Sequence, residues 1–517
     1  MPDVTLSDIC FENSRRYPHK IAVVDGEVRL TWPEFDNRVN RAAHLLSARG
    51  VVSGDRVLWL AQSSYRFLEV MMACARLGAM ICPANWRQSA KEFGDVIEDL
   101  SPTMIIWQNQ EIGDRVDGAR ALTTVNAEWI QHDSAGPDGY EALLQGAKSN
   151  PFPSGADPHD PLLVIYTAAH GGRPCGSMIS HRNLISMATV TTPKTRTDHN
   201  CVFINSGPLF HIGNFQFDSM PVFIAGGTNV YVRRVDEEAL LRLIAEEHAT
   251  SAFLMPPTIV KMKELNQSAG KDISTLRAGP MGAVWGDDLP PDTTAWGRDP
   301  SGFGQTEVTG MPLLSAFGGR GIGNAGRPSP LCQVRIVGTD GKEVADGVAG
   351  EIAVRGDTVH LGYWNRPEIN ASRMRGGWWH TTDLGRRESD GTIQFLGTMT
   401  RMVKSAAENI YPAEVESCLL THPAVREAAI IGVPDPQFTQ SVKAIVALRP
   451  GETATAEDII EHCRQRIASY KKPKAVEFVD ALPRVAGATD YEALDRMFGG
   501  GNYPGTAQIG APVTSIS

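Results

Sequence analysis

The sequence predicts an α/β protein with at least two domains, and three observations lead to this expectation. The chain has 517 residues, which is enough to bury a large core and too many for one ordinary domain. Helix and strand signals alternate through residues 1–150, as is typical of layered α/β structures. Near Gly397 the pattern changes to a compact segment with strands and a helix of its own. We therefore expect a large N-terminal domain over residues 1–398, a small mobile α/β domain over 399–497 and a flexible tail over 498–517.

Caps and apolar runs predict the individual elements. A helix should begin after Thr31, whose side chain can cap the first turn together with Glu34, and should end near Gly50. Residues 57–60 are typical of a short buried strand, and residues 67–77 of an apolar helix. The small domain is expected to contain strands over 428–433, 443–448 and 475–479 and a helix over 456–467.

Composition excludes several classes of function. Hydrophobic residues make up 42% and charged residues 21% of the chain, as in globular proteins. The net charge of −10 argues against general nucleic-acid binding. No apolar run reaches the roughly 18–20 residues that cross a bilayer, and the start of the chain is not a signal peptide, so we expect a cytoplasmic protein without a membrane partner. Eight cysteines without a Cys-x-x-Cys pair indicate reduced thiols, and we expect no tightly bound metal.

The most informative segment is residues 166–176, which read Tyr-Thr-Ala-Ala-His-Gly-Gly-Arg-Pro-Cys-Gly. This frame resembles the phosphate-binding signature of the adenylate-forming (ANL) superfamily, which contains acyl-CoA synthetases, peptide-synthetase adenylation domains and luciferases. In that superfamily a Ser, two Thr and a Lys of this loop hold the triphosphate of ATP. Here those positions are Ala168, His170, Gly171 and Cys175. The loop has therefore lost the hydroxyls and the lysine with which the superfamily binds ATP.

Other motifs of the superfamily follow in order over residues 5–495. Phe303 to Glu307 resemble a Tyr-Gly-x-Thr-Glu segment whose ring covers adenine, whose Thr binds the α-phosphate and whose Glu holds magnesium. Asp383 matches a carboxylate that accepts both ribose hydroxyls, and residues 281–284 match a strand end against the other face of adenine. The resemblance thus implies these acyl-AMP-binding residues: Gly282, Ala283, Phe303, Gly304, Gln305, Thr306, Glu307 and Asp383.

The resemblance also implies an acyl pocket and catalytic groups. Residues 208–214 match the segment whose aromatic or His side chain gates the acyl pocket, so we assign His211, Gly213 and Asn214 to that pocket. His211 is in addition a candidate general base for a thiol, with gating and packing as the alternatives. Lys404 and Asn409 are retained in the later motifs, and we assign them catalytic roles.

Coenzyme A and an acyl-AMP are the cofactors and substrates that the resemblance implies. Lys471 and Lys472 begin a Lys-Lys-Pro-Lys run that we expect on the surface, where it would suit the phosphates of coenzyme A or form a solvated face. Ala406 and Ala407 replace a Gly-containing pair that lines the pantetheine tunnel in the superfamily. The added methyl of Ala407 counts against thioester formation.

The substituted residues can be sorted by the reaction step that they serve in the superfamily. Superfamily enzymes first make an acyl-adenylate from acid and ATP, and then rotate the small domain so that the thiol of coenzyme A displaces AMP. The phosphate loop and a late lysine, here Ala488 or Thr489, serve the first step, and the hinge residue, here Thr400, serves the rotation. Contacts to adenine, ribose and the α-phosphate are mostly kept. Because losing one preorganised donor typically costs about 10²–10³ in rate, adenylation should be nearly abolished.

We therefore expect a non-adenylating acyl-CoA ligase, which converts a preformed acyl-AMP and coenzyme A into acyl-CoA and AMP. An upstream adenylating enzyme is then the expected partner, and such a division is typical of specialised-metabolite biosynthesis. Two alternatives stay open: a complete ATP-dependent acyl-CoA synthetase with a rearranged ATP site, and an inactive acyl-adenylate-binding pseudoenzyme. Small residues in the candidate acyl-pocket segments 211–217 and 301–311 would permit a bulky acid.

Overall fold

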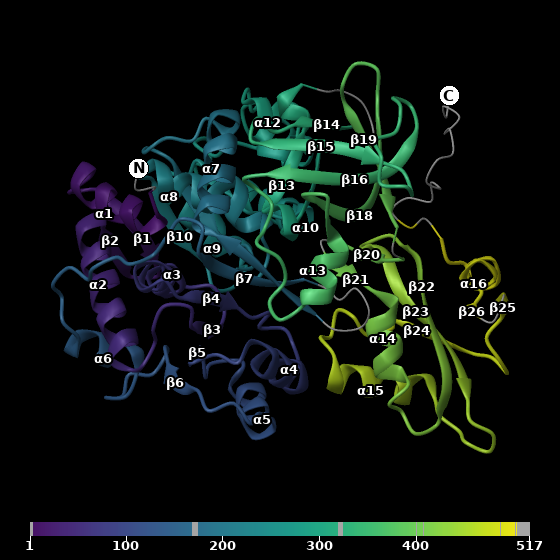
Figure 1. Ribbon diagram of the computed structural model, residues 1–517. Coiled ribbons are helices and arrows are strands. Elements are labelled where there is room, and N and C mark those ends of the chain that lie inside the picture. Colours follow the sequence, from purple (N-terminus) through teal and green to yellow (C-terminus); the bar gives the residue numbers. More distant parts are fainter. Residues whose placement is uncertain are drawn as a thin grey trace.

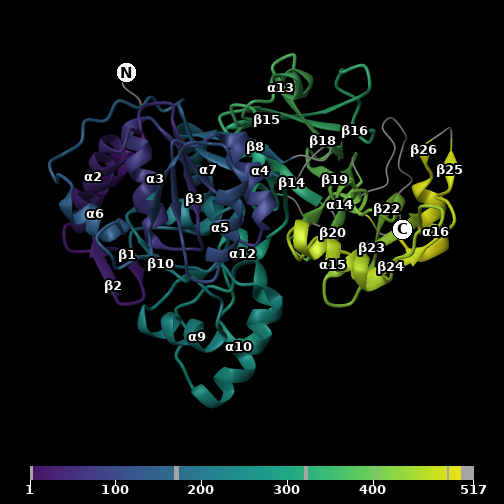
Figure 2. The same cartoon turned by 90° about the horizontal axis from the view of Figure 1, so that it is seen from below.

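A computed structural model describes residues 4–167, 174–318, 324–399, 401–406, 408–485, 488–501 and 503, and the statements below concern these residues. A large domain occupies the left and top of Figure 1, and a small domain in green to yellow lies beside it on the right. Figure 2 shows the same separation from below. Strand β19 (Ile393–Thr398) pairs within the large domain, and β20 (Val403–Ser405) pairs within the small one.

Two sheets of mostly parallel strands build the first part of the large domain. One has the strand order β11-β9-β10-β1-β2 and the other β6-β5-β3-β4-β7-β8, with β2 and β8 antiparallel to their neighbours. The first sheet contains β1 (Ile21–Asp25), β2 (Val28–Thr31), β9 (Val202–Asn205), β10 (Thr228–Tyr231) and β11 (Ser251–Ala252). The second contains β3 (Arg56–Leu60), β4 (Met80–Pro83), β5 (Met104–Trp107), β6 (Glu128–Gln131), β7 (Pro161–Thr167) and β8 (Cys175–Ser180).

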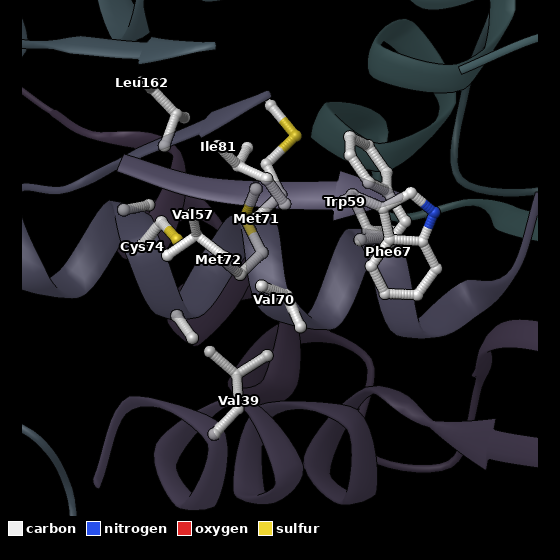
Figure 3. Packing of buried hydrophobic residues seen from close by; sticks show 14 of the residues in the cluster. Val39, Val57, Trp59, Phe67, Val70, Met71, Met72, Cys74, Ile81 and Leu162 are labelled. Atoms are coloured by element: carbon white, nitrogen blue, oxygen red, sulfur yellow. The ribbon is translucent and has the colours of Figure 1, made fainter. Parts of the chain in front are cut away.

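Helices cover both sheets and supply the largest core. Helix α3 packs on α2 and on strands of the second sheet, so that Met71 and Cys74 lie near Val39, Val57 and Ile81 (Figure 3). The helices of this part are α1 (Leu6–Arg16), α2 (Trp32–Ala48), α3 (Tyr65–Leu77), α4 (Ala90–Leu100), α5 (Gly113–Leu122), α6 (Tyr140–Gly146), α7 (His181–Thr195), α8 (Met220–Ala225), α9 (Glu237–Glu246), α10 (Pro256–Ala269), α11 (Gly282–Trp285) and α12 (Ala295–Arg298).

The predicted helix starts and ends in this region are confirmed. The side chain of Thr31 accepts a hydrogen bond from the backbone N–H of Glu34, and the Glu34 carboxylate accepts one from the Thr31 backbone. This reciprocal capping satisfies donors that would otherwise be unpaired in the first turn of α2. Helix α3 ends at Gly78, whose φ of 71° reverses the chain toward β4.

A third sheet, with the order β12-β13-β14-β19-β18-β16-β15 and with β17 paired to β18, completes the large domain. It contains β12 (Gly302–Gln305), β13 (Gly310–Leu314), β14 (Asn324–Pro328), β15 (Cys332–Val337), β16 (Ala349–Gly356), β17 (Met374–Arg375), β18 (Trp378–Arg387) and β19, and α13 (Pro367–Arg373) lies between β16 and β17 in the chain. One edge of this sheet, β12 with the turn that follows it, carries residues 303–307 of the predicted nucleotide site, and the middle of β18 carries Asp383.

The small domain is a separate α/β unit whose predicted elements are confirmed. Its sheet has the order β21-β20-β23-β22, and β24 pairs with β23. Its elements are β20, β21 (Glu408–Ile410), α14 (Pro412–Leu419), β22 (Val425–Asp435), β23 (Thr439–Leu448), α15 (Ala456–Arg466), β24 (Ala475–Phe478), β25 (Arg484–Val485), β26 (Ala488–Thr489) and α16 (Tyr491–Phe498).

Tyr503, within the predicted tail, contacts the small domain. The hydroxyl of Tyr503 accepts from the backbone N–H of Gly432 over 2.8 Å and donates to Asp495 over 2.8 Å. Its ring packs against the core of the small domain. The flexibility expected of residues 498–517 stays a prediction.

Two further expectations concern the whole chain. All eight cysteines lie among the described residues, and each is buried and outside any disulfide, in agreement with the expected reduced thiols. Within the described ranges, none of the helices has the length and apolar character needed to span a bilayer.

Candidate active site

A cavity of about 710 Å³ lies between the two domains, and residues of both line it. The large domain contributes the end of β12, the middle of β18 and the segment before η1 (Phe215–Ser219). The small domain contributes the β20–β21 hairpin and Tyr470. A cavity of this size can enclose a nucleotide with an attached group. The predicted residues Phe303, Gly304, Gln305, Thr306, Glu307, Asp383, His211, Gly213, Lys404 and Asn409 all line it.

Asp383 is held within the large domain by a chain of hydrogen bonds. Gln305 Nε2 donates to Asp383 Oδ2 over 2.8 Å, and Gln305 Oε1 accepts from Trp379 Nε1 over 3.3 Å. Burial, reinforced by the negative charge of Glu307, raises the pKa of Asp383 from 3.8 to about 7. An acceptor in this environment gains strongly from a ligand that donates two hydroxyls to it.

Glu307 and Phe303 are fixed in the same wall. The hydroxyl of Tyr363 donates to Glu307 Oε1 over 2.6 Å, and burial raises the pKa of Glu307. The ring of Phe303 stacks on Phe395, with ring centroids 5.5 Å apart. We refer to Phe303, Gln305, Glu307 and Asp383 as the large-domain wall.

Thr382, next to Asp383, carries local backbone strain. Its φ is 59°, in the left-handed region that a β-branched residue rarely adopts. The Thr382 backbone N–H donates to Glu351 Oε1 over 2.9 Å, and the Thr381 hydroxyl donates to the backbone oxygen of Ile352 over 2.7 Å. These bonds hold the strained turn from which Asp383 reaches the cavity.

The β20–β21 hairpin forms the opposite wall. Lys404 and Asn409 face each other across it, and Lys404 Nζ donates to Asn409 Oδ1 over 2.7 Å. Burial lowers the pKa of Lys404, and the neighbouring Glu408 opposes that shift. Glu408 Oε1 also accepts from Arg87 Nη1 of the large domain over 2.8 Å. We refer to Lys404, Glu408, Asn409, Tyr411 and Tyr470 as the small-domain wall.

The expectation that Lys471 lies on a basic surface is wrong. Lys471 is 4% exposed, and its Nζ contacts Glu414 of the small domain and Glu92 of the large domain, the latter at 3.0 Å. Burial alone would lower the pKa of Lys471, but Glu414, Tyr470 and Glu92 together raise it. Lys471 is therefore an ion-paired link between the domains, while Lys472 donates to the backbone oxygen of Ser469 over 3.2 Å.

Further contacts join the domains beside this link. Ser89 Oγ donates to the backbone oxygen of Arg466 over 2.7 Å, and Asn85 Nδ2 donates to the hydroxyl of Tyr470 over 3.3 Å. The segment that leads into α4 therefore supports the small-domain wall. This arrangement places the Lys404–Asn409 hairpin at the cavity.

His211 lines the cavity in a defined orientation. Its Nδ1 accepts from the backbone N–H of Gly213 over 3.0 Å, so the neutral ring carries its proton on Nε2. The enclosing walls lower the pKa of His211; the charge of Glu408 opposes this shift and that of Lys404 adds to it. The ring can thus donate a hydrogen bond from Nε2, which favours this role over that of a general base.

Five of the predicted site residues that the structure describes do not line the cavity, and Lys472 is one of them. Gly282 and Ala283 begin the short helix α11, because the chain turns helically after Gly279 where a strand end was expected. Asn214 points into the core, where its Nδ2 donates to Asn205 Oδ1 over 2.8 Å. Ala406 lies at the exposed hairpin turn with a φ of 51°. Its neighbour, residue 407, lies outside the described residues.

The two positions of the missing lysines lie apart from the cavity lining. Cys175 is 4% exposed, and burial raises the pKa of its thiol, with Arg366 opposing that shift. Thr167 and Pro174 line the cavity, and residues 168–173, with most of the altered loop, lie outside the described ranges. The β25–β26 hairpin, which includes the late-lysine position, lies beside α16 at the outer edge of the small domain in both views (Figures 1 and 2).

Sequence reasoning missed several residues of the site. The cavity is also lined by Tyr411 and Tyr470, and Lys471 pairs with Glu92, but none of these three partners carried a sequence signal of its own. Tyr411 and Glu414 do stand within a retained motif. Among the described residues, no group of three or more His, Cys, Asp or Glu side chains is placed to hold a metal ion. Glu307, which the resemblance links to magnesium, does not by itself form a protein-ligated metal site.

The layered large domain, the small domain and the nucleotide-sized cavity between them define an adenylate-forming fold. The family model "AMP-binding enzyme" matches residues 10–364, and "AMP-binding enzyme C-terminal domain" matches residues 414–487. The chain belongs to this family of AMP-binding enzymes, in the branch of the acyl-CoA ligases.

Individual relatives agree with this assignment. Feruloyl-CoA synthase from Amycolatopsis sp. is 33% identical, over 91% of this chain and 94% of that protein. Indoleacetate–CoA ligase from Aromatoleum aromaticum is 31% identical, over 91% and 93%. Among solved structures, the amide bond synthetase McbA from Marinactinospora thermotolerans superposes with a TM-score of 0.80, covering 96% of this chain and 100% of that one at 23% identity, which shows the fold alone.

Proposed function

We propose that this acyl-CoA ligase catalyses only the thioester-forming half-reaction, from a preformed acyl-AMP and coenzyme A. The observation that carries this proposal is that residues facing the nucleotide are retained, while the lysine of the phosphate loop is lost. Phe303, Thr306 and Asp383 of the predicted nucleotide site line the cavity, while the position of the phosphate-loop lysine holds a buried thiol, Cys175. The relatives are acyl-CoA synthetases, so the loss of adenylation rests on the substitutions of this chain alone.

The residues of the cavity divide the work of that half-reaction. Asp383 accepts the ribose hydroxyls, Phe303 covers adenine, and Lys404 at the small-domain wall offers a cation to the α-phosphate. The thiol sulfur attacks the acyl carbon, the bond from that carbon to the phosphate oxygen breaks, and the thiol proton is released to water. His211 Nε2 donates to the carbonyl oxygen as negative charge develops on it. Positioning supplies the rest, because the mixed anhydride is already activated.

The acid is proposed to be ring-bearing. The names of two relatives specify ferulate and indoleacetate as the acids they activate, and glycines of β12 and β13 line the cavity of this chain. The division of labour resembles that of the non-adenylating ligase of platensimycin-type diterpenoid biosynthesis. We accordingly propose an upstream adenylating enzyme as partner, a role in specialised metabolism and a cytoplasmic location.

Paired assays test the proposal. The purified chain is first given a panel of ring-bearing acids with ATP and Mg²⁺, and pyrophosphate is measured. It is then given the corresponding synthetic acyl-adenylates with coenzyme A, and thioester and AMP are measured. We expect no pyrophosphate and efficient thioester formation. Pyrophosphate release at synthetase rates would establish a complete enzyme, and failure to use any adenylate would favour a binding protein without activity.

A further inference from the structure

Strand β18 contains a bulge at the point where Asp383 reaches the cavity. In the pairing of β18 with β16, the single residue Ile352 lies opposite three residues, Thr381–Asp383. Extra residues in one strand interrupt the ladder of backbone hydrogen bonds and re-aim the side chains there. The φ of 59° at Thr382 belongs to this bulge. Asp383 therefore leaves the regular strand, and its position depends on the groups that hold the bulge.

The carboxylate of Glu351, on the neighbouring strand β16, takes the place of a backbone partner for this bulge. Its Oε1 accepts from the backbone N–H of Thr382 over 2.9 Å. Glu351 is 6% exposed, so the bond is a charge-assisted one away from water, which is stronger than a neutral bond. The backbone N–H of Asp383 donates to the Thr381 hydroxyl over 3.1 Å. The side chain of Glu351 thus fixes the centre of the bulge.

Two side chains keep Glu351 in a single orientation. Its Oε2 accepts from Arg375 Nη2 over 3.1 Å and lies 2.8 Å from His380 Nδ1. A buried carboxylate without such partners would be costly. Since Oε1 is occupied by the bulge and Oε2 by Arg375 and His380, the carboxylate cannot rotate without losing bonds on both sides.

Asp383 has one oxygen left for a ligand. Its Oδ2 accepts from Gln305 Nε2 over 2.8 Å, whereas its Oδ1 accepts no hydrogen bond from the residues that the structure describes. Oδ1 is not enclosed, and Asp383 lines the cavity, so a bound group can reach this atom. A displacement of the bulge by about 1 Å would take Oδ1 out of hydrogen-bonding range of that group.

We infer that Glu351 is a positioning residue that gives the cavity its preference for ribose over deoxyribose. Glu351 does not line the cavity and acts on Asp383 through the backbone of Thr382. A 2′-deoxyribose offers one donor fewer to Asp383, so the discrimination depends on where its carboxylate is held. The inference rests on the proposed function in one respect, since both take the cavity to hold an adenylate.

Binding of AMP, the product of the proposed half-reaction, tests this inference without knowledge of the acyl group. Calorimetry gives the Kd of AMP and of 2′-deoxy-AMP, and their ratio is the readout. We expect AMP to bind the native chain at least tenfold more tightly than 2′-deoxy-AMP. Glu351→Leu should reduce this ratio to less than about threefold. Glu351→Gln keeps an oxygen for the Thr382 N–H and should stay within about threefold of the native ratio.

A purely structural role for Glu351 would not change the ratio, because a reduced folded fraction affects both nucleotides equally. Glu351→Asp keeps the charge but is one methylene shorter, so it should lower the ratio even if Glu351→Leu fails to fold. Glu343→Leu is the matched control, since Glu343 is an exposed carboxylate that pairs with Arg335 of the same sheet over 3.4 Å. It should leave the ratio native.

Three results would overturn the inference: no preference for AMP in the native chain, a native ratio in both Glu351→Leu and Glu351→Asp, or a lowered ratio in Glu343→Leu. Absence of AMP binding would overturn it as well. The expected ratios without thioester formation from any acyl-adenylate would instead overturn the proposed function and leave this inference standing.

Discussion

The two walls of the cavity satisfy their polar groups in different ways. In the large-domain wall, Asp383 and Glu307 find their partners, Gln305 and Tyr363, within the same domain. In the small domain, Glu408, Tyr470 and Lys471 are paired across the interface, with Arg87, Asn85 and Glu92. The first set of bonds persists wherever the small domain lies, and the second exists only in the present arrangement. Holding the nucleotide and assembling the reacting geometry are therefore separable properties of this molecule.

Removing the ion-paired link at Lys471 should weaken the contact between the two domains, and we expect this to be the largest of the effects. Lys471→Met leaves Glu92 and Glu414 buried and unpaired, a change that typically costs about 3–5 kcal/mol. If that cost falls on docking, the docked population decreases by more than about 100-fold, and kcat for thioester formation decreases with it. Binding of a sulfamoyl analogue to the large domain should change little.

Lys261→Met is the control for this experiment, because Lys261 Nζ pairs with Glu237 Oε2 of its own domain over 2.9 Å, away from the cavity. Stopped-flow thioester formation gives kcat, and small-angle scattering reports the position of the small domain. An unchanged scattering profile together with an unchanged kcat in Lys471→Met would show that the ion pair does not hold the domains together.

Asp383→Ala should weaken the large-domain side of the cavity. The carboxylate can accept two ribose hydroxyls, and the loss of even one such bond, worth about 1.5–3 kcal/mol when well buried, should weaken acyl-adenylate binding at least tenfold. The scattering profile should stay native, in contrast to Lys471→Met. Asp390→Ala removes an exposed loop carboxylate that accepts from Thr392 and serves as the control. A Kd unchanged by Asp383→Ala would mean that this pocket does not hold ribose.

The raised pKa of Asp383 predicts a pH dependence of stability for the nucleotide-free protein. Its pKa is about 7 in the folded chain against an ordinary value of 3.8, so the folded state binds the proton more tightly. The corresponding stabilisation is complete below about pH 4 and is lost as pH rises through 7. Chemical unfolding at several pH values should show this decline in the native chain and a weaker one in Asp383→Asn. Parallel curves for the two would contradict the assignment.

The smallest expected effect is a gain in stability when a strained residue is replaced, with one such residue taken from each side of the cavity. Thr382 and Ala406 both have positive φ, at 59° and 51°. Replacing either with Gly removes the steric cost of the left-handed region, about 1–2 kcal/mol, and adds about 0.4–1 kcal/mol of unfolded-state entropy. We expect a net gain of between zero and about 1.6 kcal/mol in each, measured by thermal unfolding. Ala413→Gly, inside α14, should destabilise the protein and serves as the control.

Much of the fold could be predicted from sequence because its signals are local. The capping box at Thr31, the Gly78 end of α3 and the alternating strands of the small domain each depend on neighbours in the chain. Residues 281–284 were misplaced because the same small residues suit a strand end and a helical turn. Only the surrounding packing decides between the two.

Part of the candidate site could also be predicted, because its signals too are local in the sequence. Asp383, Glu307 and Lys404 stand in contiguous motifs, so pattern comparison finds them. The role of Lys471 depends on Glu92, which lies far away in sequence, and no local signal distinguishes a lysine buried between two carboxylates from one on a solvated face. Gln216 lies within the candidate acyl-pocket segment 211–217, but its burial in the cavity wall depends on packing and not on the residue type.

The burial of all eight cysteines has a consequence for a protein that handles a thiol substrate. Burial raises the pKa of Cys74, Cys82 and Cys175, so these sulfurs offer little thiolate for disulfide exchange. These three cysteines should therefore resist mixed-disulfide formation with oxidised coenzyme A. Cys418 differs, because a hydrogen bond with Cys463 lowers its pKa. A chromogenic thiol reagent added to the native protein should therefore react with free coenzyme A well before it reaches Cys74, Cys82 or Cys175.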